Sequence, residues 1–247
     1  MNMRTLLTTL LLLVALIVPS AAVAEPLSSD QVQQVERLIR EYLLAHPELL
    51  VEMSNRLRAQ QEQATAQRVK EVMATRRAEL VSDPNSYVAG NASGDVTVVE
   101  FFDYQCGYCK RVHPALTTLL ERDRGVRLVL KELPVLGPGS EMAARAAVAS
   151  LAQPGKYHAF HTALMQNQGS LDERTVLAVA GRVGLDVGKL TTDMKSDRVS
   201  SVISANRELA AALGVNGTPA FVIGDRLVPG AVSLERLLEM VAQQRKK

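Results

Sequence analysis

Residues 96–110 read VTVVEFFDYQCGYCK, and this stretch decides the fold of the chain. It follows a Gly-Asp turn signal and begins with β-branched and aromatic residues, a composition that predicts a buried strand. Beyond the Cys-Gly-Tyr-Cys tetrapeptide, the apolar residues Val112, Leu116 and Leu119 recur at helical spacing. The sequence therefore predicts a strand that leads directly into a helix, with Cys106 at the helix N-terminus.

The two cysteines of this stretch predict redox chemistry. The thiolate is the reactive form of cysteine, and the free N–H groups and dipole of a helix start stabilise a negative charge. Cys109 lies one turn further along the helix and is expected to be the less accessible thiol. We therefore expect Cys106 to attack a substrate disulfide and Cys109 to resolve the mixed disulfide. No second pair competes, because the 247 residues contain only these two cysteines.

Three other uses of a Cys-x-x-Cys pair are disfavoured. A structural disulfide of this spacing closes too short a loop to restrict the unfolded chain much. A zinc site requires about four ligands, and the sequence has no second Cys-x-x-Cys. Attachment of a c-type haem requires His directly after the second cysteine, where Lys110 stands. Redox use is therefore favoured over metal binding and over a purely structural role.

Two motifs carry a resemblance to a known family. Residues 99–110, VEFFDYQCGYCK, resemble the active-site segment of the DsbA-like thiol–disulfide oxidoreductases, which have a thioredoxin fold. Residues 217–224, GTPAFVIG, resemble the cis-proline loop and the following strand of the same family. The resemblance covers the chain from about Tyr87 to the C-terminus.

The resemblance implies an α/β fold, namely a thioredoxin domain over residues 86–247 with an inserted helical domain at about 140–195. It makes the two cysteines a redox-active disulfide and places Thr218 and Pro219 opposite them. It also implies an N-terminal helical oligomerisation stalk of the kind found in ScsC-type members of the family.

Glu100 and Lys131 are expected to belong to the same site. Glu100 lies in an otherwise apolar strand, where an acidic side chain is costly unless it is paired or protonated. Lys131 lies in the next predicted strand, residues 125–134, which should run parallel to the first because a helix connects them. The resemblance places this acid and this lysine beneath the dithiol, where they tune it and move protons. The alternative is an ion pair between the strands without a catalytic role.

Residues 1–24 are predicted to be a signal peptide. Arg4 precedes a leucine-rich run, and Ala22 and Ala24 give the small-x-small pattern of a cleavage site after Ala24. The run is shorter than the ~20 residues that span a bilayer, although an uncleaved anchor is the alternative. Export to the oxidising periplasm fits a dithiol that exchanges with disulfides.

Residues 25–85 are predicted to form a separate helical stalk. Apolar residues recur at helical spacing on both sides of His46-Pro47, and the sequence then becomes rich in Gln, Ala and Arg. Such helices cannot build a core alone, so they pack either on the thioredoxin domain or against further copies of the chain. We favour a homo-oligomer, a dimer or a trimer, formed through residues 28–80.

The rest of the sequence indicates no cofactor, metal or nucleic-acid partner. The loop at residues 137–139 lacks the spacing of a phosphate-binding loop. His158 and His161 have no acidic or thiol ligands nearby in sequence and are interpreted as surface or packing residues. Without its signal peptide the chain carries 27 basic and 26 acidic residues, which gives no reason to expect nucleic-acid binding.

These features predict an exported thiol–disulfide oxidoreductase that exchanges disulfides with other exported proteins and is reset by a membrane redox partner. Gly107-Tyr108 stands where the best-known oxidase of the family has Pro-His. Without that histidine the reduced pair is less stabilised and the pair is a weaker oxidant, so isomerase or reductase activity is favoured. The alternatives are a dithiol oxidase and a copper-binding protein that uses the two thiolates as a soft metal site.

Overall fold

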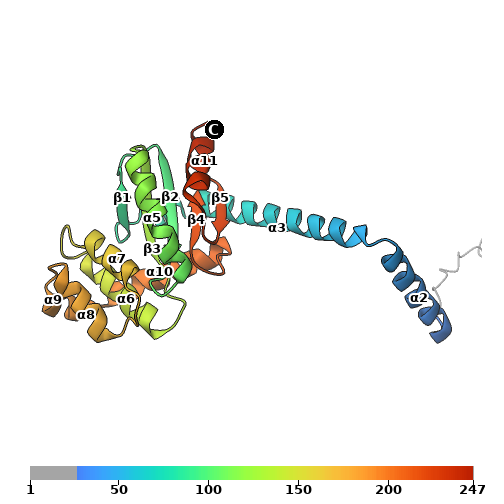
Figure 1. The fold of residues 1–247 in the computed structure, drawn as a ribbon, viewed down its shortest axis with the longest axis horizontal. Helices are drawn as coiled ribbons and strands as arrows, with labels where there is room; N and C mark the ends of the chain where they lie inside the picture. The colour runs from blue at the N-terminus through green and yellow to red at the C-terminus, as the bar shows by residue number, and fades with distance from the viewer. Residues whose placement is uncertain (1–26, 247) are drawn as a thin grey trace, which may run out of the picture. The chain divides into compact units, whose positions relative to one another are not determined.

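The computed structural model describes residues 27–246, and these divide into two units at Leu57–Arg58. The predicted signal peptide and its cleavage site lie outside the described residues. Each unit is described by itself, and its elements are labelled as in Figure 1. No helix within residues 27–246 has both the length and the apolar character needed to cross a membrane.

The N-terminal unit contains helix α2 (Ser29–Ala45) and the first part of helix α3 (Glu48–Thr75). The Ser28 side chain caps α2 by accepting from the Gln31 backbone, and the Gln31 side chain in turn accepts from the Ser28 backbone. The break between the helices falls at His46-Pro47, as predicted. Helix α2 buries none of its side chains within this chain.

The second unit is built on a mixed five-stranded sheet in the order β1-β3-β2-β4-β5. The central strand β2 (Val96–Phe102) pairs in parallel with β3 (Val126–Glu132) and antiparallel with β4 (Ala220–Ile223). Strands β1 (Tyr87–Gly90) and β5 (Arg226–Pro229) form the two edges. The parallel pairing of β2 and β3 confirms the predicted strand–helix–strand unit.

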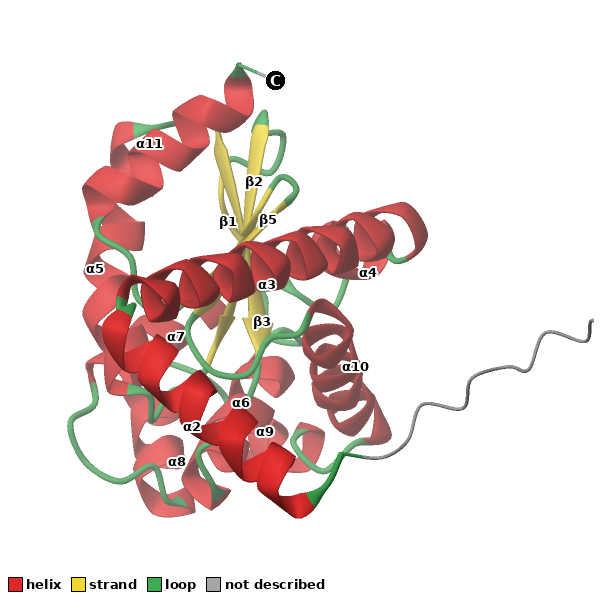
Figure 2. Cartoon of the chain, turned by 90° about the vertical axis from the view of Figure 1, so that its right-hand side faces the viewer, coloured by secondary structure: helices red, strands yellow, loops and turns green. Residues whose placement is uncertain are grey.

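Helices cover both faces of this sheet (Figure 2). Helices α5 (Gly107–Arg122) and α11 (Leu234–Arg245) bury apolar residues with β2 and β3 on one face. Helices α4 (Arg77–Val81) and α10 (Asp197–Leu213) contribute to the apolar cluster on the opposite face. The sheet is therefore the middle layer of three, which is the predicted α/β arrangement.

Four helices follow β3 and form the inserted helical region. They gather beside one end of the sheet, as Figure 1 shows, and share the larger apolar core. These helices are α6 (Pro138–Ser150), α7 (Tyr157–Gln166), α8 (Glu173–Arg182) and α9 (Val187–Asp193).

The boundary between the two units differs from the one predicted near residue 85. Val69 and Val72 of α3 and Leu80 of α4 are buried in one cluster with Val99 and Phe101 of the central strand. These sparse apolar positions attach the C-terminal part of the helical segment to the sheet. The second unit therefore begins within α3.

Candidate active site

The turn between β2 and α5 places Cys106 at the N-cap of the helix. The Cys106 N–H donates to the Asp103 carbonyl at 3.1 Å, and the Cys106 carbonyl accepts from the Lys110 N–H at 3.1 Å. The Cys109 N–H points back at Cys106 Sγ at 3.5 Å. The first thiol therefore faces a free backbone donor of the helix start, as the sequence predicts.

Both cysteines are free thiols, and they differ in their surroundings. Cys106 is 5% exposed and Cys109 is fully buried, which agrees with the predicted order of accessibility. Burial raises the pKa of the Cys109 thiol well above its ordinary value, and the nearby Glu100 carboxylate raises it further.

The loop before β4 lies against the first thiol. Phe101 of β2 pairs with Ala220 of β4, which brings the preceding Thr218 and Pro219 to the end of β2. The Cys106 thiol donates to the Thr218 carbonyl at an Sγ–O distance of 3.2 Å, and the Thr218–Pro219 peptide bond is cis. The structure thus places the Cys-x-x-Cys motif and the Thr218-Pro219 loop, the two motifs that carried the resemblance, in direct contact.

Glu100 lies on the sheet face that carries the dithiol. It shares this face with Val98 and Phe102, two residues away on either side, which belong to the apolar core beneath α5 together with Cys109. Burial raises the pKa of Glu100 to about 8. An acid with this pKa is mostly protonated at neutral pH, so it is buried without a full charge.

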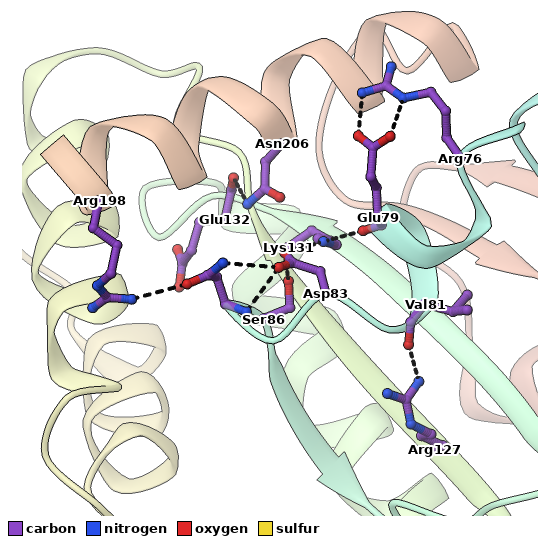
Figure 3. A network of polar contacts seen from close by, with 11 residues as sticks. Arg76, Glu79, Val81, Asp83, Ser86, Arg127, Lys131, Glu132, Arg198 and Asn206 are labelled. Atoms are coloured by element: carbon purple, nitrogen blue, oxygen red, sulfur yellow. Dashed lines mark hydrogen bonds and ion pairs between the residues drawn. The ribbon is translucent and has the colours of Figure 1, made fainter.

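Lys131 does not join Glu100, and the predicted pairing of these two residues is corrected by the strand register. Phe101 pairs with Lys131, whereas Glu100 pairs with Leu130, so the two polar side chains lie on opposite faces of the sheet. Figure 3 shows where Lys131 goes instead: its ammonium donates to the Glu79 carbonyl at 2.6 Å and to Asp83 Oδ2 at 2.8 Å.

A buried polar group on the dithiol face was not found from the sequence. Glu132 Oε1 accepts from the hydroxyls of Tyr157 at 2.7 Å and Tyr104 at 3.1 Å. The Tyr104 oxygen also lies 3.0 Å from Nδ1 of His161, so this histidine is a packing residue, as predicted. Burial raises the pKa of Glu132 well above its ordinary value. The signal was present, because Glu132 follows Lys131 and alternation must place one of them on each face.

The described residues contain no group of three or more His, Cys, Asp and Glu side chains that could hold a metal ion. His158 is exposed at the surface of α7, and its ring stacks with Tyr87 at a centroid distance of 6.1 Å. The site brings together the thiol pair, the Thr218 backbone and the two buried acids.

A dithiol at the N-cap of a helix, facing the loop that enters an antiparallel strand, defines a thioredoxin-fold redox protein. Residues 97–242 match the family described as DSBA-like thioredoxin domain, over more than half of the chain. The chain belongs to this family of thiol–disulfide oxidoreductases. Residues 31–64 separately match the family described as copper resistance protein ScsC N-terminal domain.

Solved structures of similar proteins agree with this assignment. A thioredoxin-like oxidoreductase from Silicibacter pomeroyi DSS-3 is 50% identical, with a TM-score of 0.68 over 69% of this chain and 98% of that chain. The catalytic domain of Proteus mirabilis ScsC is 32% identical, with a TM-score of 0.66 over 72% of this chain and 98% of that chain.

Curated relatives include longer proteins. The Na(+)/H(+) antiporter NhaA 3 of Salinispora tropica is 33% identical over 158 residues, which cover 63% of this chain and 24% of the antiporter. The chain thus spans about a quarter of the length of the curated relatives that it matches first.

Replacing Glu100 by Gln tests the burial of the acid. In the folded state Glu100 keeps its proton at pH values where the unfolded chain releases it. Its contribution to the free energy of unfolding therefore falls as the pH rises from about 4.3, the ordinary value, to about 8. We expect Glu100→Gln to flatten this decline, measured by urea unfolding between pH 5 and 8. Glu121→Gln, at an exposed position on α5, is the matched control, and equal slopes in the two variants would contradict the assignment.

Replacing Lys131 by Met separates a structural from a redox role. The change removes the Lys131 ammonium from the Asp83 carboxylate and the Glu79 carbonyl, so we expect a loss of about 1–3 kcal/mol in the free energy of unfolding. Because the side chain lies on the face away from the dithiol, we expect the reduction potential to move by less than ~15 mV. The double variant Lys131→Met/Asp83→Asn should regain part of the stability. A large shift in potential would place Lys131 back in the redox machinery.

Proposed function

We propose that the chain is an exported thiol–disulfide oxidoreductase that exchanges disulfides with cysteine pairs of other exported proteins. The contact of Cys106 Sγ with the Thr218 carbonyl carries this proposal. It places the outer thiol beside a loop backbone that can pair with an extended substrate strand, while the second thiol stays buried behind it.

The proposed exchange proceeds in two thiol displacements. The Cys106 thiolate attacks one sulfur of a substrate disulfide, forms a mixed disulfide and releases the other substrate sulfur as a thiolate. The Cys109 thiolate then attacks Cys106 Sγ, so that a Cys106–Cys109 disulfide forms and the second substrate sulfur leaves. The substrate is reduced and the protein oxidised by two electrons, and the reverse sequence oxidises a substrate. We assign to the deprotonated form of Glu100 the acceptance of the Cys109 proton. With a pKa of about 8 this form is the minor one at neutral pH, and its fraction grows as the pH rises.

Isomerase or reductase activity fits the site better than strong oxidation. Gly107-Tyr108 supplies no cationic side chain between the cysteines. The ionisable side chains of the sheet beneath the pair are acidic, Glu100 and Glu132, since Lys131 lies on the opposite face. Neither acid supplies a positive charge that would stabilise the Cys106 thiolate, and a less stabilised reduced form makes a weaker oxidant.

The N-terminal unit is proposed to hold several copies of the chain together, as a dimer or a trimer. Helix α2 leaves Leu38, Ile39 and Tyr42 more than half exposed, on the same side of the helix. An apolar stripe of this size normally marks an interaction surface. The match to the N-terminal domain of ScsC covers this helix. We further propose that the chain is exported to the periplasm and that a membrane redox partner resets its dithiol.

Soft-metal binding by the two thiolates is the second candidate function. The match to a domain named for copper resistance favours it, and Cu(I) accepts two thiolates. A metal held by both sulfurs would block mixed-disulfide formation, so loss of exchange by the reduced wild-type protein when Cu(I) is added would support this second function.

Trapping tests the exchange function. In Cys109→Ser the resolving thiol is missing, so a mixed disulfide with a substrate should persist at Cys106. In Cys106→Ser no such species should form, because Cys109 is buried. Non-reducing electrophoresis after incubation with a disulfide-containing protein, followed by reduction, measures the difference. Equal amounts of adduct in both variants, or none in either, would rule out the proposed roles.

Removing the apolar stripe of α2 tests the link between assembly and isomerisation. We expect Leu38→Gln/Ile39→Gln to give a monomer in light scattering and to lose most isomerisation of a scrambled disulfide protein. Isomerisation benefits from several active sites that act on one substrate at a high effective concentration. Reduction of a small disulfide needs only one active site and should therefore fall less. The control Arg37→Gln/Glu41→Gln changes the opposite side of the same helix. A wild-type chain that is already monomeric would contradict this part of the proposal.

A further inference from the structure

A cavity of about 390 Å³ lies between helix α10 and the segment formed by α4 and the turn that follows it. Lys131 contributes to its lining, so the cavity is on the sheet face away from the dithiol. Its volume falls in the range of small-molecule sites, which extends from ~300 to ~1,000 Å³. The exchange reaction makes no use of this space. We call it the α10 cavity.

Most charges that line the α10 cavity are neutralised by a neighbour. The Lys131 ammonium lies 2.8 Å from Asp83 Oδ2. The Glu79 side chain is held by the Arg76 guanidinium, whose two donating nitrogens lie 2.9 and 2.6 Å from the carboxylate oxygens. Figure 3 shows both pairs beside α10. Neither pair therefore leaves a net charge for a ligand to meet.

Arg198 of α10 supplies the remaining charge. Its guanidinium donates to the Asn85 side-chain oxygen at 3.3 Å and to the Val148 carbonyl at 3.4 Å, as Figure 3 shows for the first contact. Both distances are beyond the usual range of hydrogen bonds from nitrogen to oxygen. Among the described residues no carboxylate pairs with this guanidinium. The cavity therefore carries one net positive charge, which complements a carboxylate.

A buried amide oxygen opens into the same cavity. Asn206 lines it and is 2% exposed. The Asn206 amide nitrogen is the atom that donates to the Glu132 carbonyl at 3.1 Å, because a carbonyl only accepts. None of the described residues donates to the amide oxygen, and this oxygen is not sealed within the protein. Buried side-chain oxygens normally have a partner, so this one is an acceptor that a bound molecule can fill.

An apolar wall separates these two polar positions. Val202, Ala205 and Leu209 line the cavity and recur along α10 at helical spacing, on the same side as Arg198 and Asn206. Arg198 and Asn206 are eight positions apart in this helix, a rise of ~12 Å. A molecule that reaches both must therefore be elongated, with an apolar body between its polar ends.

We propose that the α10 cavity binds an elongated aromatic acid that carries a hydroxyl at the end opposite its carboxylate. The carboxylate accepts from Arg198, the ring packs on Val202 and Ala205, and the hydroxyl donates to the Asn206 amide oxygen. The ligand and the dithiol lie on opposite faces of the sheet, so binding does not depend on the exchange function.

Three related small molecules test the assignment by ligand-observed NMR titration of the full mature chain. The probe is para-hydroxyphenylpropionate, which we expect to bind saturably. Its amide lacks the charge and should bind about tenfold more weakly, as expected for the loss of a hydrogen bond to a charged group. Phenylpropionate lacks the hydroxyl and should bind about fivefold more weakly, as expected for one neutral hydrogen bond.

Variants of α10 locate the bound molecule. In Arg198→Gln we expect the preference for the acid over the amide to disappear. Arg174→Gln, at an exposed position of α8 outside the cavity, is the matched control and should retain it. Ala205→Leu fills the cavity and should abolish binding, whereas Ser204→Leu changes the exposed neighbour outside the lining and should not.

Four outcomes would overturn the proposal. The first is the absence of saturable binding, which would leave the α10 cavity to solvent. The second is equal binding of the acid and the amide. The third is unchanged binding in Ala205→Leu, or loss of binding in Cys106→Ser, either of which would place the probe elsewhere on the chain. The fourth is a change of oligomeric state in Ala205→Leu, seen by light scattering, which would assign this surface to contact between copies.

Discussion

The site depends on the pairing of the central strand β2 with two partners at once. Its parallel ladder with β3 sets the loop that carries Val135 and Leu136, and its antiparallel ladder with β4 sets Thr218. In both ladders the register fixes which side chains face the dithiol, because a slip of one residue moves every side chain to the other face. A slip between β2 and β4 would also move the Thr218 carbonyl away from Cys106.

The same pairing explains why the acids beneath the dithiol are tolerated. An ionised carboxylate without a partner is too costly in a packed interior, so the group keeps its proton instead. Burial raises the pKa of both Glu100 and Glu132. Glu132 also accepts hydrogen bonds from two tyrosine hydroxyls. The one buried lysine of the described sheet lies on the other face and is paired with Asp83. The ionisable groups beneath the dithiol are therefore acids whose pKa values are raised by burial.

The sequence predicted the parts of the site that lie within single elements. The strand, the tetrapeptide and the helical spacing together placed Cys106 at a helix start, and the second motif placed Thr218 opposite it. The sequence failed where a contact depends on register between elements. The partner of Lys131 could not be read from spacing, because Asp83 lies in a turn far away in sequence. The buried role of Glu132 likewise depends on two tyrosines from different segments, and the unit boundary depends on a few apolar residues in a polar helix.

The Asp103 side chain connects the cysteine turn to the loop after β3. Its four accepted hydrogen bonds use the full capacity of a carboxylate, about two on each oxygen, so neither segment can move without losing a buried bond. The loop after β3 and the turn that carries Cys106 are therefore held together by one side chain. In reactions that depend on orientation, a misplacement of about 1 Å can cost ~100-fold in rate. A buried carboxylate beside the cysteine turn can thus govern how well the Cys106 thiol is aligned for attack.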